Sequence, residues 1–208
     1  MPSRYYHEAL WQQVPEGSEP SDFALRRQFL LEHVRAGERV LDVGCGEGHF
    51  AAELVRAGAH VVGIDVAEVP LRRARGRHPE LDLRLVAAEG PWELADASFD
   101  VVWAGEVIEH VADTAAWLSE VRRVLRSGGR LLVSTPAHGR LALMRVALSR
   151  RAFAARFDPR GDHLRFYSRE TLTRVLGDLG LEEIQVRDAA GPPGARRLLL
   201  AHAIRSRF

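Results

Sequence analysis

The sequence predicts a doubly wound α/β domain with a mostly parallel seven-stranded sheet, a final antiparallel strand and a helical insert. After Gly37, short apolar runs of strand length alternate with helical segments; these runs cover residues 39–43, 60–64, 82–86, 99–104 and 130–134. Helical connections of this length force successive strands to pair in parallel. Ligands of such a sheet bind beyond the carboxyl ends of its strands, so we expect the functional site there.

The two ends of the chain complete this domain. Residues 1–36 are predicted to form an aromatic arm and a first helix over residues 22–35, because apolar side chains recur there at helical spacing. Residues 37–138 form the expected cofactor-binding core and residues 139–167 a helical lid insert. Residues 168–208 add a helix capped by Ser168 and ending near Gly177 or Gly180, then strands over 182–186 and 198–204 that a Gly-Pro-Pro-Gly turn joins as an antiparallel hairpin.

Composition excludes several classes of protein. The chain has 208 residues, 46% of them hydrophobic, which suits one core. All 29 basic residues are arginine, so a lysine nucleophile or Schiff base is excluded. A net charge of +1 argues against broad capture of nucleic acid. With one cysteine, no leader pattern and no apolar run of bilayer length, we expect a cytoplasmic protein without an internal disulfide.

A glycine-rich turn is the strongest local signal. Residues 40–43 form a strand that leads directly into Gly44-Cys45-Gly46-Glu47-Gly48 and then into a helix near His49. Glycine permits the unusual backbone angles of a tight turn and lets a ligand approach the main chain without meeting a Cβ. The alternative is a tight turn without a ligand, but three alternating glycines exceed what a turn requires.

Charge near this turn bears on the kind of cofactor. The spacing is Gly-x-Gly-x-Gly, whereas dinucleotide binders favour Gly-x-Gly-x-x-Gly. Glu47 is awkward beside a pyrophosphate but tolerable beside a cationic sulfonium, which favours a sulfonium nucleoside. About 20 residues further on, Asp65 ends the second strand, where this fold binds ribose hydroxyls. Asp65 also suits an N-cap of the following helix, and the two roles are compatible.

Several motifs together resemble class I S-adenosylmethionine-dependent methyltransferases, which have a Rossmann-like fold. The motifs are Asp42 to Gly48, Asp65, Ser98-Phe99-Asp100-Val101-Val102, Glu106-Val107-Ile108-Glu109-His110 and Leu125-Arg126-Ser127-Gly128-Gly129, within residues 37–187. The resemblance implies S-adenosylmethionine as cofactor, with the glycine turn at its methionine part and Asp65 at its ribose. An Asp-Ala pair usual at the adenine is replaced by Ala88-Glu89, which makes Glu89 the expected contact. The implied cofactor-binding residues are Asp42, Gly44, Cys45, Gly46, Asp65, Val66, Glu89, Gly90 and Gly105.

The Glu-x-x-Glu-His motif after the fourth strand predicts half of a metal site. In a helical turn Glu106, Glu109 and His110 project from one face, so their polar groups can converge, and His163 could supply a further ligand. Carboxylates and imidazoles suit Mg²⁺, Mn²⁺ or Zn²⁺. Two alternatives stay open. The acids are also typical of a helix start, and His110 or His163 could act as a general base without a metal.

This arrangement is similar to that of small-RNA 3′-terminal 2′-O-methyltransferases and of the ubiquinone-biosynthesis O-methyltransferases of the methyltransferase type 11 group. In those enzymes a metal gathers vicinal hydroxyls for methylation. The resemblance therefore implies catalytic roles for His110 and His163 and a small-molecule oxygen as acceptor.

The insert is rich in arginine. Leu141, Met144, Leu148 and Phe153 are expected on one side of a helical stretch over residues 139–157, which also carries Arg140, Arg145, Arg150, Arg151 and Arg156 and no acid. Such a segment suits peripheral contact with an anionic membrane, while the alternative is a lid whose arginines are solvated.

We therefore predict transfer of a methyl group from S-adenosylmethionine to an oxygen of a small molecule, with or without a divalent metal. One alternative keeps the class but methylates RNA or a nitrogen or carbon acceptor. Others are an NAD-dependent oxidoreductase, which the glycine spacing and the lack of lysine oppose, and a binding module without activity. The sequence does not indicate an oligomeric state.

Overall fold

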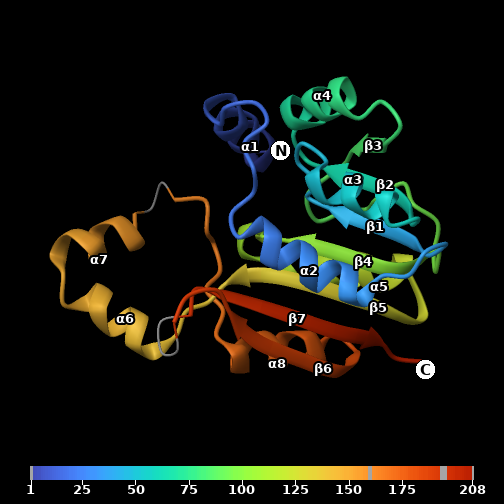
Figure 1. The fold of residues 1–208 in the computed structure, drawn as a ribbon. Coiled ribbons are helices and arrows are strands. Elements are labelled where there is room, and N and C mark those ends of the chain that lie inside the picture. The colour runs from blue at the N-terminus through green and yellow to red at the C-terminus, as the bar shows by residue number, and fades with distance from the viewer. Residues whose placement is uncertain (1, 159–160, 193–195, 208) are drawn as a thin grey trace.

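The computed structural model describes residues 2–158, 161–192 and 196–207 and contains a seven-stranded sheet (Figure 1). Its spatial order is β3 (Asp82–Leu85), β2 (His60–Asp65), β1 (Arg39–Val43), β4 (Phe99–Gly105), β5 (Leu125–Pro136), β7 (Leu198–Arg205) and β6 (Leu181–Ala189). Strands β1 to β5 pair in parallel, whereas β7 is antiparallel to both of its neighbours. The predicted fold class is confirmed.

Helices cover both faces of the sheet (Figure 1). On one face α2 (Phe23–His33) and α3 (His49–Arg56) bury Phe29 and Phe50 against Val40 and Trp103 of the central strands. On the other face α5 (Thr114–Val124) and α8 (Arg169–Asp178) pack on the alternate strand positions, while α4 (Glu68–Arg77) packs beside α3. Side chains of a strand alternate between faces and both faces are covered, so the central strands are mainly apolar in their middle.

Two segments differ from expectation. The predicted N-terminal arm is largely a helix, α1 (Pro2–Gln13). The insert is two short helices, α6 (Arg140–Ala147) and α7 (Arg150–Arg156), because the Ser149 hydroxyl accepts from the Ala152 amide and starts a new helix. The side chains of Leu141 and Arg145 lie outside the described residues, as do residues 193–194 of the predicted turn. Within the described part, no helix has the length and apolarity needed to cross a bilayer.

Candidate active site

A cavity of about 290 Å³ lies at the carboxyl ends of β1, β2 and β4. Val43, Gly44 and Asp65 belong to its sheet side, and Trp92 and Trp117 to its far wall. Helix α1 covers it with His7, Leu10 and Trp11. The position agrees with the rule for open α/β sheets, and the mainly apolar wall with few polar groups suits a nucleoside.

The glycine turn brings the main chain to this cavity. Gly44, Gly46 and Gly48 all have positive φ, of 69°, 54° and 77°. A Cβ on Gly44 would lie 2.5 Å from Cγ2 of Val107, and one on Gly46 would lie 3.0 Å from the ring of Trp11. These glycines therefore meet both requirements, a left-handed backbone and close approach by neighbouring groups.

Asp65 lies between the turn and the cavity. Its Oδ2 accepts from the amide of Gly46 at 2.9 Å and its Oδ1 from the amide of Ala67 at 2.9 Å. Burial raises the pKa of Asp65 to about 6, although those amides oppose the shift. Each carboxylate oxygen can accept a further hydrogen bond, so Asp65 can fix the turn and still hold ribose hydroxyls.

Asp42 is fully enclosed beneath the turn. Burial, followed by the nearby charge of Asp65, raises the pKa of Asp42 to about 8, and Arg26 opposes this shift. Within the described residues its Oδ2 has no hydrogen-bond partner. A cationic ligand above the turn would favour the ionised form of this carboxyl.

Arg26 of α2 is a site residue that the sequence analysis missed. Only 3% of it is exposed, and its guanidinium lies over the rings of Phe50, at 4.7 Å, and Trp103, at 5.8 Å. Its Nε is buried without a partner among the described residues. It lines a second hollow of about 280 Å³ that shares Trp11, Val14, Gly44 and Glu106 with the cavity. Arg26 could therefore hold a carboxylate of a ligand that crosses Gly44.

Glu47 lines the second hollow but not the cavity itself, and its charge is taken up by other groups, contrary to the charge argument made from the sequence. Its carboxylate accepts from Arg73 at 3.0 Å, from Arg77 at 2.8 Å and from the amide of Gly17 at 2.7 Å. These partners compensate its charge, so Glu47 does not discriminate between a sulfonium and a pyrophosphate. Its contacts instead fix the segment between α1 and α2 to α4.

Of the other expected cofactor residues, Val66 lines the cavity beside Asp65, whereas Cys45 and Gly105 do not line it. The side chain of Cys45 is buried against the inner sheet positions, where a Cβ on Gly63 would lie 3.0 Å from its Sγ. Gly105 ends β4 and lies against Arg26, where any Cβ would collide with the guanidinium.

Glu89 and Gly90 line an outer hollow that shares Val66, Val86 and Ala88 with the cavity. The Glu89 carboxylate accepts from the amide of Ala112 at 3.1 Å. The cavity itself is lined at this edge by Val86, Ala88 and Trp92. Glu89 therefore ties two loops together beside the cavity, and its contact with adenine stays a prediction.

The Glu-x-x-Glu-His segment is not the regular helical turn expected. Glu106 has a φ of 58°, and only Ile108–His110 form a short 3₁₀ turn, η1. The left-handed Glu106 turns its carboxylate toward β5, where it accepts from the Ser134 hydroxyl at 3.0 Å. Glu106 lines the cavity but does not belong to the group of converging ligand atoms.

Three of the predicted metal ligands do converge. Ligand atoms of Glu109, His110 and His163 all lie within 4.8 Å of one another, the only such group of three among the described residues. Glu109 is wholly buried; its Oε2 accepts from the Thr135 hydroxyl at 2.9 Å, while its Oε1 has no partner within the described chain. Burial, followed by the charge of Glu106, raises the pKa of Glu109 to about 8.

Asp162 orients this group. Nδ1 of His110 lies 2.9 Å from the carbonyl oxygen of Asp162; since a carbonyl only accepts, the neutral ring carries its proton on Nδ1 and leaves the lone pair of Nε2 available. Nε2 lies 3.9 Å from Oε1 of Glu109. The amides of Leu164 and Arg165 donate to the Glu109 carbonyl at 2.8 and 2.9 Å, which holds the loop with His163 against η1. A histidine that donates one ring nitrogen to a carbonyl is typical of metal ligands.

Helix α1 adds a third histidine that the sequence did not single out. The ring of His7 lies edge-on to that of His110, with centroids 5.8 Å apart. Glu8 fixes α1 over the cavity, because its carboxylate accepts from the amides of Glu68 and Val69, at 2.7 and 3.0 Å, at the start of α4. The periodicity of residues 1–21 could not reveal these contacts, since they form with residues about 60 to 100 positions away.

These features define the class of protein. The sheet order, the glycine turn, the acid after β2 and the covered cavity are the arrangement of class I S-adenosylmethionine-dependent methyltransferases. A methyltransferase domain family matches residues 17–186, and the chain belongs to that family.

Relatives and solved structures agree with this assignment. A probable S-adenosylmethionine-dependent methyltransferase of Mycolicibacterium smegmatis is 47% identical over 51% of this chain and 41% of its own length. A ubiquinone biosynthesis O-methyltransferase of Hahella chejuensis is 38% identical over 67% of this chain and 60% of its own length. The chain thus spans about half the length of these relatives.

Two solved structures share the fold at low identity. The phosphoethanolamine N-methyltransferase 2 of Haemonchus contortus, in complex with S-adenosyl-L-methionine, has a TM-score of 0.74 at 18% identity over 98% of this chain and 56% of that one. The geranyl diphosphate C-methyltransferase of Streptomyces coelicolor has a TM-score of 0.72 at 18% identity over 99% of both chains. The acceptor atom therefore does not follow from the fold.

Proposed function

We propose that this methyltransferase transfers a methyl group from S-adenosylmethionine to a hydroxyl oxygen of a small molecule with vicinal hydroxyls. The observation that carries the proposal is the convergence of Glu109, His110 and His163 beside the cavity. Relatives named as ubiquinone biosynthesis O-methyltransferases support an oxygen acceptor.

The cofactor site fits its ligand in charge and shape. Gly44 and Gly46 allow close approach of the main chain, and Asp65 offers oxygens for ribose hydroxyls. Arg26 offers a buried cation for the carboxylate of the methionine part, and Asp42 offers a carboxyl that a cationic ligand would ionise. When bound, the cofactor supplies a methyl group already activated on a sulfonium. The protein must mainly align the acceptor and remove one proton.

The three converging ligands also fit a divalent metal. The unpartnered Oε1 of Glu109 and the free Nε2 of His110 are two available donors, and His163 is the third. Mixed carboxylate and imidazole donors suit Zn²⁺ or Mn²⁺ best, and Mg²⁺ with added water ligands. A bound metal would lower the pKa of a coordinated hydroxyl and fix its oxygen. Without a metal, His110 or His163 would take the proton as a general base.

Methylation assays with a catechol and a matched monophenol test this proposal. We expect methyl ether formation from the catechol, loss of activity with EDTA and recovery with Mg²⁺, Mn²⁺ or Zn²⁺. His163→Ala and Glu109→Gln should lower kcat/KM at least about 100-fold, since each removes a ligand. His60→Ala, an exposed histidine at the start of β2, is the matched control. Equal rates for catechol and monophenol, unaffected by EDTA, would contradict the metal-assisted mechanism.

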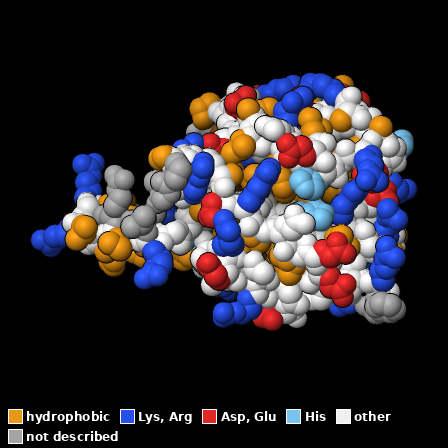
Figure 2. Space-filling view, turned by 60° about the horizontal axis from the view of Figure 1, so that its bottom comes forward, with side chains coloured by type: hydrophobic (Ala, Val, Ile, Leu, Met, Phe, Trp, Pro, Cys, Tyr) orange, Lys and Arg blue, Asp and Glu red, His pale blue; other side chains and the backbone are white. Residues whose placement is uncertain are grey.

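We also propose that the insert contacts an anionic membrane surface, where a lipophilic acceptor would be available. Helices α6 and α7 project from the body (Figures 1 and 2). They expose apolar side chains, with Leu148 86% and Met144 58% exposed, beside Arg150 and Arg151. Exposed apolar groups with arginines and no acid suit such a surface.

Co-sedimentation with phosphatidylglycerol vesicles tests the membrane contact. Binding should exceed that to phosphatidylcholine vesicles and should fall with Leu148→Asp, since a charge replaces an exposed apolar group. Val55→Asp, a partly exposed position on α3, is the matched control. Equal binding of wild type and Leu148→Asp would favour a lid with solvated arginines.

A further inference from the structure

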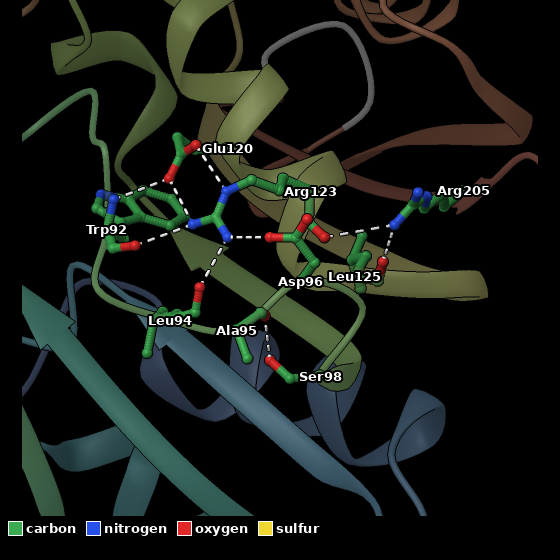
Figure 3. A network of polar contacts seen from close by, with 9 residues as sticks. All are labelled: Trp92, Leu94, Ala95, Asp96, Ser98, Glu120, Arg123, Leu125 and Arg205. Carbon is green, nitrogen blue, oxygen red and sulfur yellow. Dashed lines mark hydrogen bonds and ion pairs between the residues drawn. The ribbon is translucent and has the colours of Figure 1, made fainter.

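Arg123 of α5 lies at the centre of a polar network between that helix and the chain that follows β3 (Figure 3). Nε and Nη2 donate to the Glu120 carboxylate at 2.9 and 2.8 Å, in a forked pair. Nη1 donates to the Leu94 carbonyl at 2.7 Å and to Asp96 at 2.6 Å, and Nη2 also donates to the Trp92 carbonyl at 2.9 Å. All five N–H donors of the guanidinium are therefore used.

Glu120 adds a second connection to the same segment. Its Oε2 also accepts from the Trp92 amide at 2.8 Å. Gly90 lies so close that a Cβ there would be 2.5 Å from Cγ of Glu120. The guanidinium of Arg123 holds the pKa of Glu120 below its usual range, which keeps this acceptor ionised at neutral pH.

The segment has little structure of its own. Between residues 87 and 94, the backbone bonds within the segment are those from Gly90 to Ala87, at 3.4 Å, and from Leu94 to Trp92, at 2.7 Å. The indole of Trp92 adds a bond to the Ala87 carbonyl at 3.0 Å. Its conformation therefore depends on contacts with other segments, which are the bond between Glu89 and Ala112 and the bonds to α5.

This segment forms one wall of the cofactor cavity. Trp92, with 3% of its surface exposed, lines the cavity together with Val86 and Ala88. The amide of Val86 donates to the Asp65 carbonyl at 2.9 Å, so the wall begins directly beside the ribose-binding acid. A base attached to a ribose at Asp65 would therefore extend along this wall.

We propose that Glu120 and Arg123 are positioning residues for the cofactor's nucleoside. They hold Trp92 and the backbone of residues 86–92 in the conformation that receives the base, so that binding has no ordering cost at this wall. Neither residue lines the cavity, so each acts through Trp92. The proposal rests on the cofactor of the proposed function and is independent of its acceptor and metal.

A contact that only stabilises the fold would affect the protein differently when it is lost. Its loss would lower the melting temperature but leave the affinity of the folded protein for its ligand unchanged. Loss of a positioning contact weakens nucleoside binding well below the melting temperature, because the wall must then be ordered on binding.

Calorimetric titration of S-adenosylhomocysteine and of 5′-methylthioadenosine at 15 °C separates these roles. For Arg123→Ala we expect a Kd about tenfold or more above wild type, with a similar factor for both ligands because both carry the nucleoside. Arg123→Lys keeps the charge but not the fork, so it should restore binding only in part. Arg126→Gln is the matched control, since Arg126 is a neighbouring arginine paired with Asp100 and 54% exposed.

A KM-against-kcat split gives a second readout. Arg123→Ala should raise KM for S-adenosylmethionine with kcat changed less than about threefold. If Arg123→Ala does not fold, amide hydrogen exchange of Arg123→Lys decides: without ligand, residues 86–94 should exchange faster than in wild type, and S-adenosylhomocysteine should slow them more than it does in wild type. A Kd within twofold of wild type in folded Arg123→Ala, or equal exchange of this segment in Arg123→Lys and wild type, would overturn the positioning role alone. Absence of S-adenosylhomocysteine binding to the wild type would overturn the proposed cofactor and this role together.

Discussion

Protonation of Asp65 should control cofactor affinity. Its carboxyl has a pKa of about 6 in the free protein, and ribose hydroxyls are bound by the ionised form. Binding therefore favours deprotonation of this carboxyl, and the contribution of Asp65 to affinity should rise with pH up to about 7 and then level off. At pH 5 about one carboxyl in ten is ionised, so Kd should be about tenfold above its plateau.

The Asp65→Asn variant tests the same reasoning at fixed pH. Asparagine carries no charge and has one acceptor oxygen, so it can accept from only one of the Gly46 and Ala67 amides. Hydrogen bonds to a charged group are worth about 1.5–3 kcal/mol, so Kd should rise about 10- to 100-fold. The assay is calorimetric titration of S-adenosylhomocysteine from pH 5 to pH 8. The Asp65→Asn variant, which lacks the titrating carboxyl, shows how far other groups change the Kd with pH. A wild-type Kd that does not change between pH 5 and pH 7, or a variant with the same slope, would refute this account of Asp65.

Three further outcomes follow from the same turn. The pKa of Asp42 is raised to about 8, so the wild-type free energy of unfolding should fall as pH rises from about 4 to 8 and the buried carboxyl ionises. Urea unfolding of Asp42→Asn should therefore show a free energy of unfolding that increases relative to wild type over this range, by at most about 5 kcal/mol. A difference that does not change with pH would contradict this. Gly44→Ala should lower the free energy of unfolding by about 1–3 kcal/mol, because its Cβ would collide with Val107. Adding Val107→Ala should restore part of the lost stability, and a double variant as unstable as Gly44→Ala would refute the collision. Trp11→Ala should raise the Kd for S-adenosylhomocysteine severalfold with little change in melting temperature, since it removes part of the cover that α1 provides over the cavity. An unchanged Kd would remove Trp11 from the site.

The central sheet could be predicted because its signals are local. Each parallel strand is a short apolar run bounded by a helix, and the glycine turn marks the first crossover. Asp65 could be placed for the same reason, since it directly follows β2. The break in the insert was not predicted, because one hydroxyl, that of Ser149, decides it against a continuous helical composition.

The site was predicted only in part, because its remainder depends on distant contacts. Arg26 resembles any arginine on an amphipathic helix until α2 packs over the turn. Glu106 was expected on a helical face, but its φ of 58° turns its side chain away. His163 was placed with Glu109 and His110 by motif alone, and the backbone bonds from Leu164 and Arg165 supply the physical reason.

The most direct test of the central claim is a crystal structure with S-adenosylhomocysteine and Mn²⁺, read by anomalous scattering. The account predicts the ribose at Asp65 and one manganese peak within coordination distance of Glu109, His110 and His163. A nucleoside bound elsewhere would contradict the cofactor site, and manganese absent from these three side chains would contradict metal-assisted methylation.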